Sequence, residues 1–477
     1  MARRKKGPLF IDDVTVTGAG AKGKGVGKTE DGQVVFIQNA VPGDRVKVRV
    51  FKRKRSFVEG KAVEYHELSK DRVQPACEHF GTCGGCKWQN WDYSKQLEYK
   101  DSEVQNNLVR LGHVEVEEYL PILGCESDYF YRNKMEFSFS NKRWITEEEA
   151  QSGAELGTTN ALGFHIPGMW DKVLNVTKCH LQPDPSNAIR NFIRQYALDH
   201  NLEFFDLREQ SGLLRTVMIR TALSGENMVL IQFYDDLVEE REGLMNALIA
   251  EFPEITSLLY TINQKGNDSI YDCDIEVFHG RDHIFEVMPA YYDPTTELRF
   301  KVGPKSFYQT NPKQAHSLYV QALEFAELKG DELVYDLYTG TGTIACFLAQ
   351  KAGKVVGIES VPDAIKDAKF NAEMNGLNNT TFVVGDMKDA LTPSFVEEHG
   401  MPDVVVTDPP RDGMHAKVVE QLLNMKPKRI VYVSCNSATQ ARDLGLLQSA
   451  YRIVKSRAVD MFPQTHHIEN VAVLELK

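Results

Sequence analysis

Residues 334–345 read VYDLYTGTGTIA: an apolar run, a turn with two glycines, and the start of a helical pattern. A buried strand that passes through a glycine-containing turn into a helix is typical of an open α/β sheet, in which ligands bind at the carboxyl ends of the strands. From about residue 301, five more apolar runs alternate with helical patterns, and they end in VVGIES, VVGD, VVVTDPP, VYVSCN and VAVLEL. We therefore predict an α/β fold with an open, mostly parallel, doubly wound sheet for residues 301–477.

Acidic residues stand at the ends of the first three strands of this predicted sheet. Asp336 precedes the glycine turn, Glu359 ends the next strand, and Asp386 follows the third. The turn and Glu359 also match a dinucleotide-binding pattern. However, Asp336 would repel a pyrophosphate, whereas it suits the ammonium group of an amino-acid-bearing cofactor. Glu359 is then suited to ribose hydroxyls and Asp386 to an adenine.

This order of acids around a glycine turn resembles the Rossmann-like methyltransferases that depend on S-adenosylmethionine. The resemblance implies S-adenosylmethionine as the cofactor, with Gly340 allowing its close approach to the backbone. The alternative is an α/β sheet in which the acids only cap helices.

Further reactive side chains follow the later strands at the same predicted edge. Asp408 is followed by two prolines, which fix a rigid loop there. Cys435 ends the run VYVSCN, where a helix start and nearby donors can activate a thiol. Glu469 stands just before the last strand. The sequence thus predicts a thiol and carboxylates in one crevice, with a small core residue as the alternative for Cys435.

Residues 1–66 form a basic module in an acidic chain. They hold 15 Lys and Arg against 7 Asp and Glu, a net charge of +8, whereas the whole chain carries −12. Residues 11–66 read as short strands with glycine-rich turns, and in RVKVRV (45–50) valines alternate with a row of cations that faces solvent. This pattern favours a small OB-like barrel that binds a nucleic-acid backbone, and it resembles the RNA-binding TRAM domain. A solvated basic tail is the alternative, but it explains only RRKK at residues 3–6.

Three cysteines are spaced C-x5-C-x2-C at Cys77, Cys83 and Cys86, and Cys179 lies far downstream. Clustered thiolates hold either zinc or an iron–sulfur cluster. A zinc site usually shows two close pairs of ligands, so this three-plus-one arrangement favours a structural cubane cluster.

Residues 67–300 mix predicted strands and helices, which indicates a central α+β domain. We expect strands over 129–140 and 215–223, and helices over 186–200 and 237–252. No apolar stretch approaches the roughly 18 residues needed to span a bilayer, and no secretory signal opens the chain. A cytoplasmic protein is therefore expected, with domains at 1–66, 67–300 and 301–477.

Six motifs follow one another along the chain: CEHFGTCGGCKWQNWDYSKQLEYK, KSFYQTNPKQ, DLYTGTGT, DPPRDG, SCNSATQARDL and FPQTHHIE. Together they are similar to the RNA uracil-5-methyltransferases, and most to the iron–sulfur type with a TRAM domain that acts on 23S ribosomal RNA. The resemblance implies that Cys435 is the nucleophile and Glu469 the general base. It also implies contacts to the methyl donor from Gln309, Tyr338, Glu359 and Asp408, and a 4Fe-4S cluster on Cys77, Cys83, Cys86 and Cys179.

This chemistry has a simple physical requirement. Carbon 5 of uracil is a poor nucleophile until a thiolate adds to carbon 6, and a carboxylate must afterwards remove the carbon 5 proton. The expected partner is structured RNA, with ribosomal RNA favoured over transfer RNA and the target base flipped out of its helix. No membrane or obligate protein partner is implied. Two other classes stay open, namely a non-catalytic RNA-binding protein and a nicotinamide oxidoreductase.

Overall fold

The computed structural model describes residues 9–153 and 157–477, so the basic run at residues 3–6 lies outside the described residues. The chain divides into two units. One contains the described residues up to Glu103 together with Phe462–His467, and the other contains Val104–Met461 and Ile468–Lys477. The domain boundaries at 66/67 and 300/301 stay a prediction. Within the described ranges, no helix has the length and apolar character that a membrane crossing requires.

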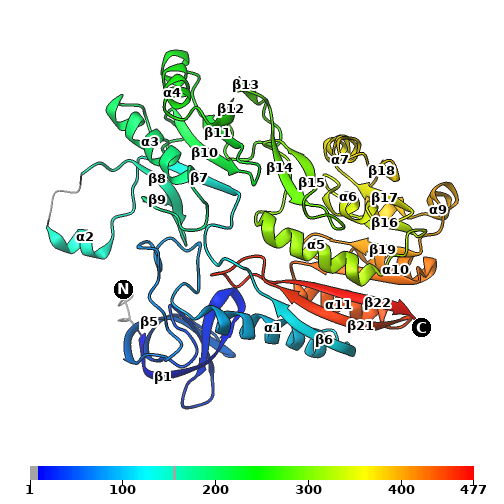
Figure 1. Cartoon of the computed structure of the whole chain (residues 1–477). Coiled ribbons are helices and arrows are strands. Elements are labelled where there is room, and N and C mark those ends of the chain that lie inside the picture. Colours follow the sequence, from blue (N-terminus) through cyan, green and yellow to red (C-terminus); the bar gives the residue numbers. More distant parts are fainter. Residues whose placement is uncertain (1–8, 154–156) are drawn as a thin grey trace, which may run out of the picture. The chain divides into compact units, whose positions relative to one another are not determined.

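The first unit begins with a closed five-stranded barrel in the order β1-β2-β3-β5-β4 (Figure 1), which confirms the predicted β-barrel. Alternate valines such as Val46 and Val48 fill its interior because successive side chains of a strand point to opposite faces. The strands are β1 (Leu9–Gly20), β2 (Lys24–Lys28), β3 (Val34–Gln38), β4 (Arg45–Arg53) and β5 (Phe57–Glu67).

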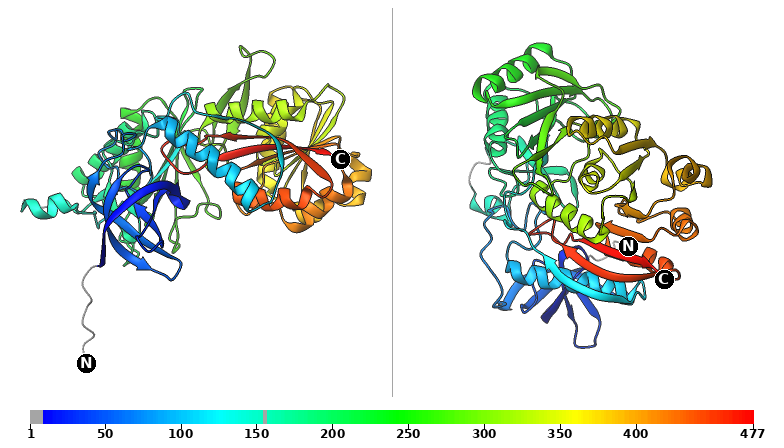
Figure 2. Two further views of the ribbon diagram at one scale, coloured as in Figure 1. Left: turned by 90° about the horizontal axis from the view of Figure 1, so that it is seen from below. Right: turned by 45° about the vertical axis from the view of Figure 1, so that its right-hand side comes forward.

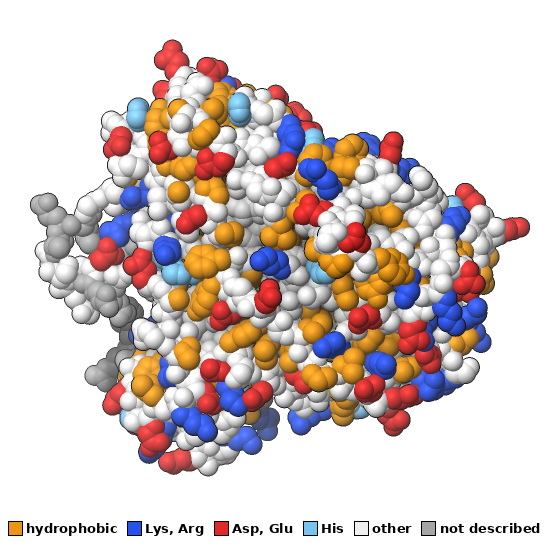
Figure 3. Space-filling view, viewed as in Figure 1, with side chains coloured by type: hydrophobic (Ala, Val, Ile, Leu, Met, Phe, Trp, Pro, Cys, Tyr) orange, Lys and Arg blue, Asp and Glu red, His pale blue; other side chains and the backbone are white. Residues whose placement is uncertain are grey.

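The predicted row of cations on β4 is partly neutralised, which the sequence alone did not indicate. Arg45 forms ion pairs with Asp13 of β1 at 2.5 Å and with Glu67 of β5 at 3.1 Å. Lys47 and Lys52 are paired in the same way with acids of β1 and β5. Figure 3 shows basic and acidic side chains intermingled at its lower left, over the barrel. The barrel surface is therefore a mixture of paired and unpaired cations.

After the barrel, the cysteine-containing segment leads to α1 (Tyr93–Arg110). Trp88 packs edge-on against Trp91 and Tyr99, with ring centroids 5.3 and 5.4 Å apart. Gln96 of α1 donates from Nε2 to Gln464 Oε1 at 3.0 Å. The PQTHH motif is thereby held within the first unit, just before Glu469 of the second.

The second unit contains a seven-stranded sheet in the order β13-β12-β11-β10-β7-β8-β9. It includes the two predicted strands, β7 (Lys134–Ser140) and β10 (Leu214–Thr221), and the two predicted helices, α3 (Ser186–Asp199) and α4 (Val238–Glu251). The other elements of this region are α2 (Glu147–Ser152), β8 (Ala161–Ile166), β9 (Met169–Asn175), β11 (Asn227–Phe233), β12 (Ile255–Ile262) and β13 (Glu276–Gly280), followed by the hairpin of β14 (Ile284–Pro289) and β15 (Glu297–Val302).

An eight-stranded sheet of the second unit has the order β18-β17-β16-β19-β20-β22-β21-β6. The first five strands in this order are parallel and β22 is antiparallel to β20, so the predicted mostly parallel α/β sheet is confirmed. β6 comes from upstream of residue 300 and pairs with β21, a position that only long-range contacts determine. The strands are β6 (Val116–Leu123), β16 (Leu333–Leu337), β17 (Lys354–Glu359), β18 (Thr380–Val384), β19 (Val404–Thr407), β20 (Arg429–Ser434), β21 (Tyr451–Val459) and β22 (Glu469–Leu476).

Helices cover both faces of this sheet (Figure 2). α5 contacts α6 and α6 contacts α7 on one face, whereas α10 contacts α8 and α11 on the other. These helices are α5 (Pro312–Ala326), α6 (Thr343–Ala349), α7 (Pro362–Met374), α8 (Met387–Ala390), α10 (Ala416–Met425) and α11 (Ser437–Leu447), and α9 (Pro393–His399) follows α8. The strand order reverses between β16 and β19, which is the position where open α/β sheets bind their ligands.

Candidate active site

The carboxyl ends of β16, β17, β19 and β20 meet at one edge of the sheet because these strands are parallel. β22 runs the opposite way, so its first residue, Glu469, lies at this same edge. The structure thus brings together side chains that the sequence places more than 130 residues apart.

Asp336 of β16 is fully buried at the switch point of the sheet. Its Oδ2 accepts a hydrogen bond from Thr339 Oγ1 at 2.5 Å, whereas its Oδ1 is buried without a hydrogen-bond partner. Burial, together with the nearby charge of Asp408, raises the pKa of Asp336 to about 7. An unpartnered buried carboxylate oxygen has a free energy cost that a cationic donor offsets. This fits the ammonium group predicted for the cofactor.

The turn after β16 has the geometry of a ligand cradle. Tyr338, Gly340 and Gly342 all have positive φ, at 63°, 55° and 80°. A Cβ at Gly340 would meet no atom within 4 Å, so open space lies beside this glycine, whereas a Cβ at Gly342 would lie 2.9 Å from Ala368. Gly340 therefore borders the crevice, and Gly342 is required for packing.

Glu359 contacts this turn and also caps a chain segment. Its Oε2 accepts from the Gly340 backbone N at 3.2 Å. Its Oε1 accepts from the backbone N of Ser360 at 2.7 Å and of Val361 at 3.0 Å. Both oxygens accept hydrogen bonds from the protein, and these contacts fix the carboxylate in place. A carboxylate has about four lone-pair sites, so Glu359 can still accept from ribose hydroxyls through the remaining ones.

Asp386 matches the alternative that acids only cap helices. It is the N-cap of α8 and accepts from the Lys388 backbone N at 3.2 Å, and it also forms an ion pair with Lys388 Nζ at 2.8 Å. These hydrogen bonds lower the pKa of this exposed carboxyl. A contact of Asp386 with an adenine stays a prediction.

Cys435, Asp408 and Glu469 lie close enough to one another for their charges to interact. Burial, together with the charges of Glu469 and Asp408, raises the pKa of the Cys435 thiol to about 11. Burial likewise raises the pKa of Asp408 to about 7 and that of Glu469 well above its ordinary value, the latter also through the charge of Asp408. Arg411 opposes these effects at both Cys435 and Glu469. This edge of the sheet is therefore rich in acid groups, which suits a cationic ligand.

The loop that carries Asp408 and Arg411 is fastened to α11. The Arg411 backbone O accepts from Asn436 Nδ2 at 2.9 Å and from Thr439 Oγ1 at 3.0 Å. Asp443 of α11 is buried and accepts from the Met414 backbone N at 2.8 Å. Because Asn436 follows Cys435 and is the N-cap of α11, one set of contacts holds both the loop and the cysteine.

Gln309 precedes α5, whose N-cap is Asn311 with Pro312 at the first helical position. Asn311 Oδ1 accepts from the Gln314 backbone N, and its Nδ2 donates to the Met461 backbone O at 3.0 Å. The helix start is therefore well defined, and Gln309 lies in the loop just before it. A contact of its side chain with the methyl donor stays a prediction.

Tyr319 of α5 faces the crevice, and sequence reasoning missed it. Its side chain is buried, its hydroxyl lies 3.3 Å from Thr343 Oγ1, and its pKa is raised by burial and by the charges of Asp408, Asp336 and Glu469. In the sequence, Tyr319 reads as one more apolar position of a helix. No local signal distinguishes it from a core residue.

The four predicted cluster ligands are divided between the two units. Cys77, Cys83 and Cys86 belong to the first unit, and Cys179 belongs to the second. Among the residues that the structure describes, no group of three or more His, Cys, Asp or Glu side chains is arranged to hold a metal ion. A 4Fe-4S cluster on these cysteines stays a prediction from the sequence pattern.

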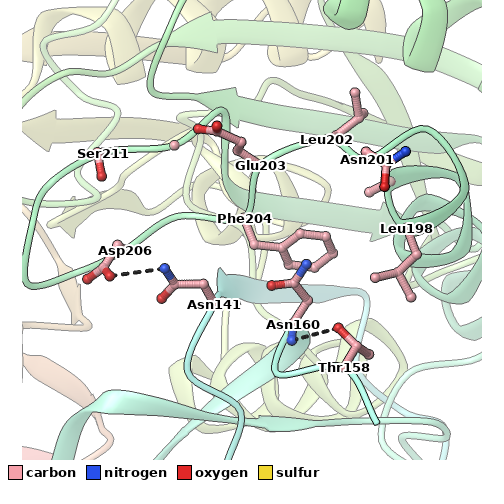
Figure 4. Close-up of a pocket in the computed structure, with 12 residues that line it drawn as sticks. Asn141, Thr158, Asn160, Leu198, Asn201, Leu202, Glu203, Phe204, Asp206 and Ser211 are labelled. Atoms are coloured by element: carbon pink, nitrogen blue, oxygen red, sulfur yellow. Dashed lines mark hydrogen bonds between the residues drawn. The ribbon is translucent and has the colours of Figure 1, made fainter.

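A separate hollow of about 540 Å³ lies in the seven-stranded-sheet region (Figure 4). Its lining includes the amides and the acid of Asn141, Asn160, Asn201 and Asp206. Asn141 Nδ2 donates to Asp206 Oδ2 at 3.0 Å. None of the predicted site residues lines this hollow.

The comparisons with known proteins agree with this geometry. The family model of the tRNA (uracil-5-)-methyltransferases matches residues 274–477, and the TRAM domain model matches residues 12–63. The chain is 54% identical to an uncharacterized RNA methyltransferase of Bacteroides thetaiotaomicron over 96% of its own length and 100% of the relative. It is 38% identical to one of Chlorobaculum tepidum, over 99% and 97% of the two chains.

A solved structure is similar over the whole chain. It is the Pyrococcus abyssi tRNA (uracil-54, C5)-methyltransferase in complex with S-adenosyl-L-homocysteine, with a TM-score of 0.74 and 26% identity. The likeness covers 97% of this chain and 100% of the other. The fold of this chain, over nearly its whole length, is therefore found in a solved structure.

Proposed function

Since the chain belongs to the RNA uracil-5-methyltransferase family and uses S-adenosylmethionine, we propose that it methylates carbon 5 of a uridine in 23S ribosomal RNA. The observation that supports this proposal is the proximity of Cys435 and Glu469 at the ends of the neighbouring strands β20 and β22, together with Asp408. A thiol next to a buried carboxylate is what carbon 5 methylation of uracil requires.

In the proposed reaction, the Cys435 thiolate forms a bond to carbon 6 of the uracil, and the electron pair moves to carbon 5. Carbon 5 then takes the methyl group, whose electron pair stays with the sulfur of the donor. The Glu469 carboxylate removes the proton from carbon 5, and the Cys435 sulfur leaves with its bonding electrons. A base with a raised pKa is well matched to this proton transfer.

Activation of the thiol needs positive charge because its pKa is about 11 in the acid-rich crevice. Arg411 and the N-terminal end of α11 supply part of this charge. A sulfonium and an ammonium group near Asp336 and Asp408 would supply the rest. Gln309, Tyr338, Glu359 and Gly340 are then the groups that orient the donor.

We also propose that Cys77, Cys83 and Cys86 bind a structural iron–sulfur cluster, on the basis of their C-x5-C-x2-C spacing. Cys179 stays the fourth ligand that the sequence predicts. No step of the reaction depends on this cluster.

A transfer RNA uridine is the second candidate substrate. The matching family model and the similar Pyrococcus abyssi enzyme are both named for transfer RNA. The cysteine motif and its resemblance to the iron–sulfur type support ribosomal RNA instead. Mapping 5-methyluridine in ribosomal and transfer RNA from cells with and without this protein distinguishes the two.

The mechanism is tested by trapping. RNA that contains 5-fluorouridine has no proton on carbon 5 for Glu469 to remove, so a covalent complex should accumulate on Cys435. Cys435→Ala should form no complex, whereas Cys273→Ser, a buried cysteine of the other sheet region, should form as much as the wild type. If the wild type forms no adduct at Cys435, the mechanism is wrong.

A further inference from the structure

The 303–311 loop, which joins β15 to α5, carries Gln309 and is held by Asn133. The side-chain Nδ2 of Asn133 donates to the Gln309 main-chain O at 3.1 Å, and its backbone N donates to the Thr310 O at 2.8 Å. Asn133 is buried and directly precedes β7 of the seven-stranded sheet. One residue of that sheet region therefore fixes two successive carbonyls of the loop.

The amide of Asn133 is itself oriented by Glu286 of β14. Asn133 Nδ2 also donates to Glu286 Oε2 at 3.2 Å. Glu286 is buried, and its Oε1 accepts from the backbone N of Leu223 at 2.6 Å and of Val287 at 3.2 Å. Every contact of this carboxyl is an accepted hydrogen bond. Since Glu286 and the Gln309 carbonyl are both acceptors, only the NH2 group of Asn133 can face them.

Asn133 Oδ1 is buried and has no hydrogen-bond partner. The side chain thus keeps two donor contacts and leaves its oxygen without a partner, so its orientation is decided by the two acceptors on its NH2 side. The loop is also anchored by Arg220, whose Nη2 donates to the Ser306 backbone O at 2.7 Å. From the cofactor side, Thr341 Oγ1 of the glycine turn donates to the Phe307 O at 3.4 Å.

We propose that Asn133, oriented by Glu286, is a positioning residue that fixes the backbone position of Gln309 at the methyl-donor site. The inference rests on the proposed function, because it assigns Gln309 to the donor. It names a pair of residues outside the Rossmann-like sheet on which the affinity for the donor depends.

The substitution Glu286→Gln tests this chain of contacts with little change in shape. The new NH2 group would face the NH2 group of Asn133, so the amide of Asn133 has to turn over. Its oxygen would then face the Gln309 carbonyl, and the loop would lose its anchor. Asn133→Ala removes the same hydrogen bond directly.

The experiment measures the dissociation constant of S-adenosylhomocysteine by calorimetry, the KM for S-adenosylmethionine, and RNA affinity. Both variants should raise the dissociation constant of S-adenosylhomocysteine and the KM for S-adenosylmethionine, each roughly three- to tenfold. This is the effect expected for one lost hydrogen bond. RNA affinity should stay unchanged. The matched control is Thr221→Val, because Thr221 donates only its backbone N to Asn133 and its buried hydroxyl has no partner. This control should bind the product like the wild type.

Unchanged product affinity in Glu286→Gln overturns the inference, as does an equal loss of RNA and product affinity. If Asn133→Ala does not fold, the S-adenosylhomocysteine affinity of Glu286→Gln alone tests the inference. A wild-type protein that binds the product but methylates no uridine would refute the proposed function, and the comparison of product affinities would still test the role of Asn133.

Discussion

Cys435 and Glu469 both lie next to the last backbone pair between β20 and β22, at the carboxyl edge of the eight-stranded sheet. Ser434, the last residue of β20, pairs with Asn470 of β22 in antiparallel register; Cys435 directly follows Ser434, and Glu469 directly precedes Asn470. The two side chains are close enough for the charge of Glu469 to raise the pKa of the Cys435 thiol. A buried network strengthens this register, in which Gln440 of α11 accepts from Asn470 Nδ2 at 2.8 Å. The backbone pairing of their neighbours therefore keeps Cys435 and Glu469, the proposed nucleophile and base, at the same edge of the sheet.

Glu469→Gln is expected to stop the reaction after methyl transfer, because an amide cannot remove the proton from carbon 5. A covalent protein–RNA complex that carries the labelled methyl group should accumulate and be visible on a denaturing gel. Glu475→Gln, an ion-paired position near the other end of β22, should release product normally. Normal product release by Glu469→Gln would assign the base to another residue.

The Asp336 carboxyl should lower the stability of the cofactor-free protein as the pH rises from about 4 to about 7. Burial raises the pKa of Asp336 to about 7 from 3.8, so the folded state binds this proton more tightly than the unfolded state across that interval. Asp336→Asn removes the loss and should stabilise the protein at pH 8 by at most about 4 kcal/mol. Urea unfolding at pH 5 and pH 8 measures the difference. The control Asp386→Asn should lack this gain, because the pKa of Asp386 is lowered. Equal pH dependence in Asp336→Asn and the wild type would contradict the prediction.

The methyl donor should activate the Cys435 thiol. Its pKa of about 11 reflects burial and the charges of Glu469 and Asp408, and a sulfonium cation in the crevice offsets these charges. At pH 8, alkylation of Cys435 by iodoacetamide should be faster with S-adenosylmethionine than with S-adenosylhomocysteine, which has nearly the same shape but no sulfonium charge. Peptide mass spectrometry quantifies the labelled cysteine. Equal alkylation rates with both ligands would show that the sulfonium charge of the donor does not activate the Cys435 thiol.

Anaerobically prepared protein should contain iron and acid-labile sulfide in the proportions of a 4Fe-4S cluster. Cys83→Ser should lose both, whereas Cys273→Ser should retain them, because Cys273 is a buried residue outside the C-x5-C-x2-C motif. Metal analysis that finds zinc in place of iron would support the alternative reading of the cysteine spacing.

The barrel cations should contribute unequally to RNA binding. Arg45 is already paired with Asp13 and Glu67, whereas Arg49 forms no ion pair among the described residues of the barrel. Arg49→Ala should therefore weaken RNA binding and lower the salt slope by about one, and Arg45→Ala should change both much less. Titrations at several salt concentrations measure these slopes. A larger effect of Arg45→Ala would show that its ion pairs open on RNA.

The sequence alone determined which chemical groups the protein has and on which kind of element each lies. Strands, glycine turns and helix starts follow local patterns, so β16, the Asn311 cap, the valine-lined barrel and the positions of Asp336, Cys435 and Glu469 at strand ends were all predictable. The family resemblance rests on the same local motifs.

Only the tertiary structure decided how these groups meet. It turned β22 antiparallel so that Glu469 lies near Cys435, left one oxygen of Asp336 unpartnered and made Asp386 a helix cap. It also brought Tyr319 near these acids and Asn133 to the Gln309 loop. The physical reason is that strand pairing, burial and hydrogen-bond partners depend on residues far apart in the chain, and the free energy of those contacts has no counterpart in a local sequence pattern.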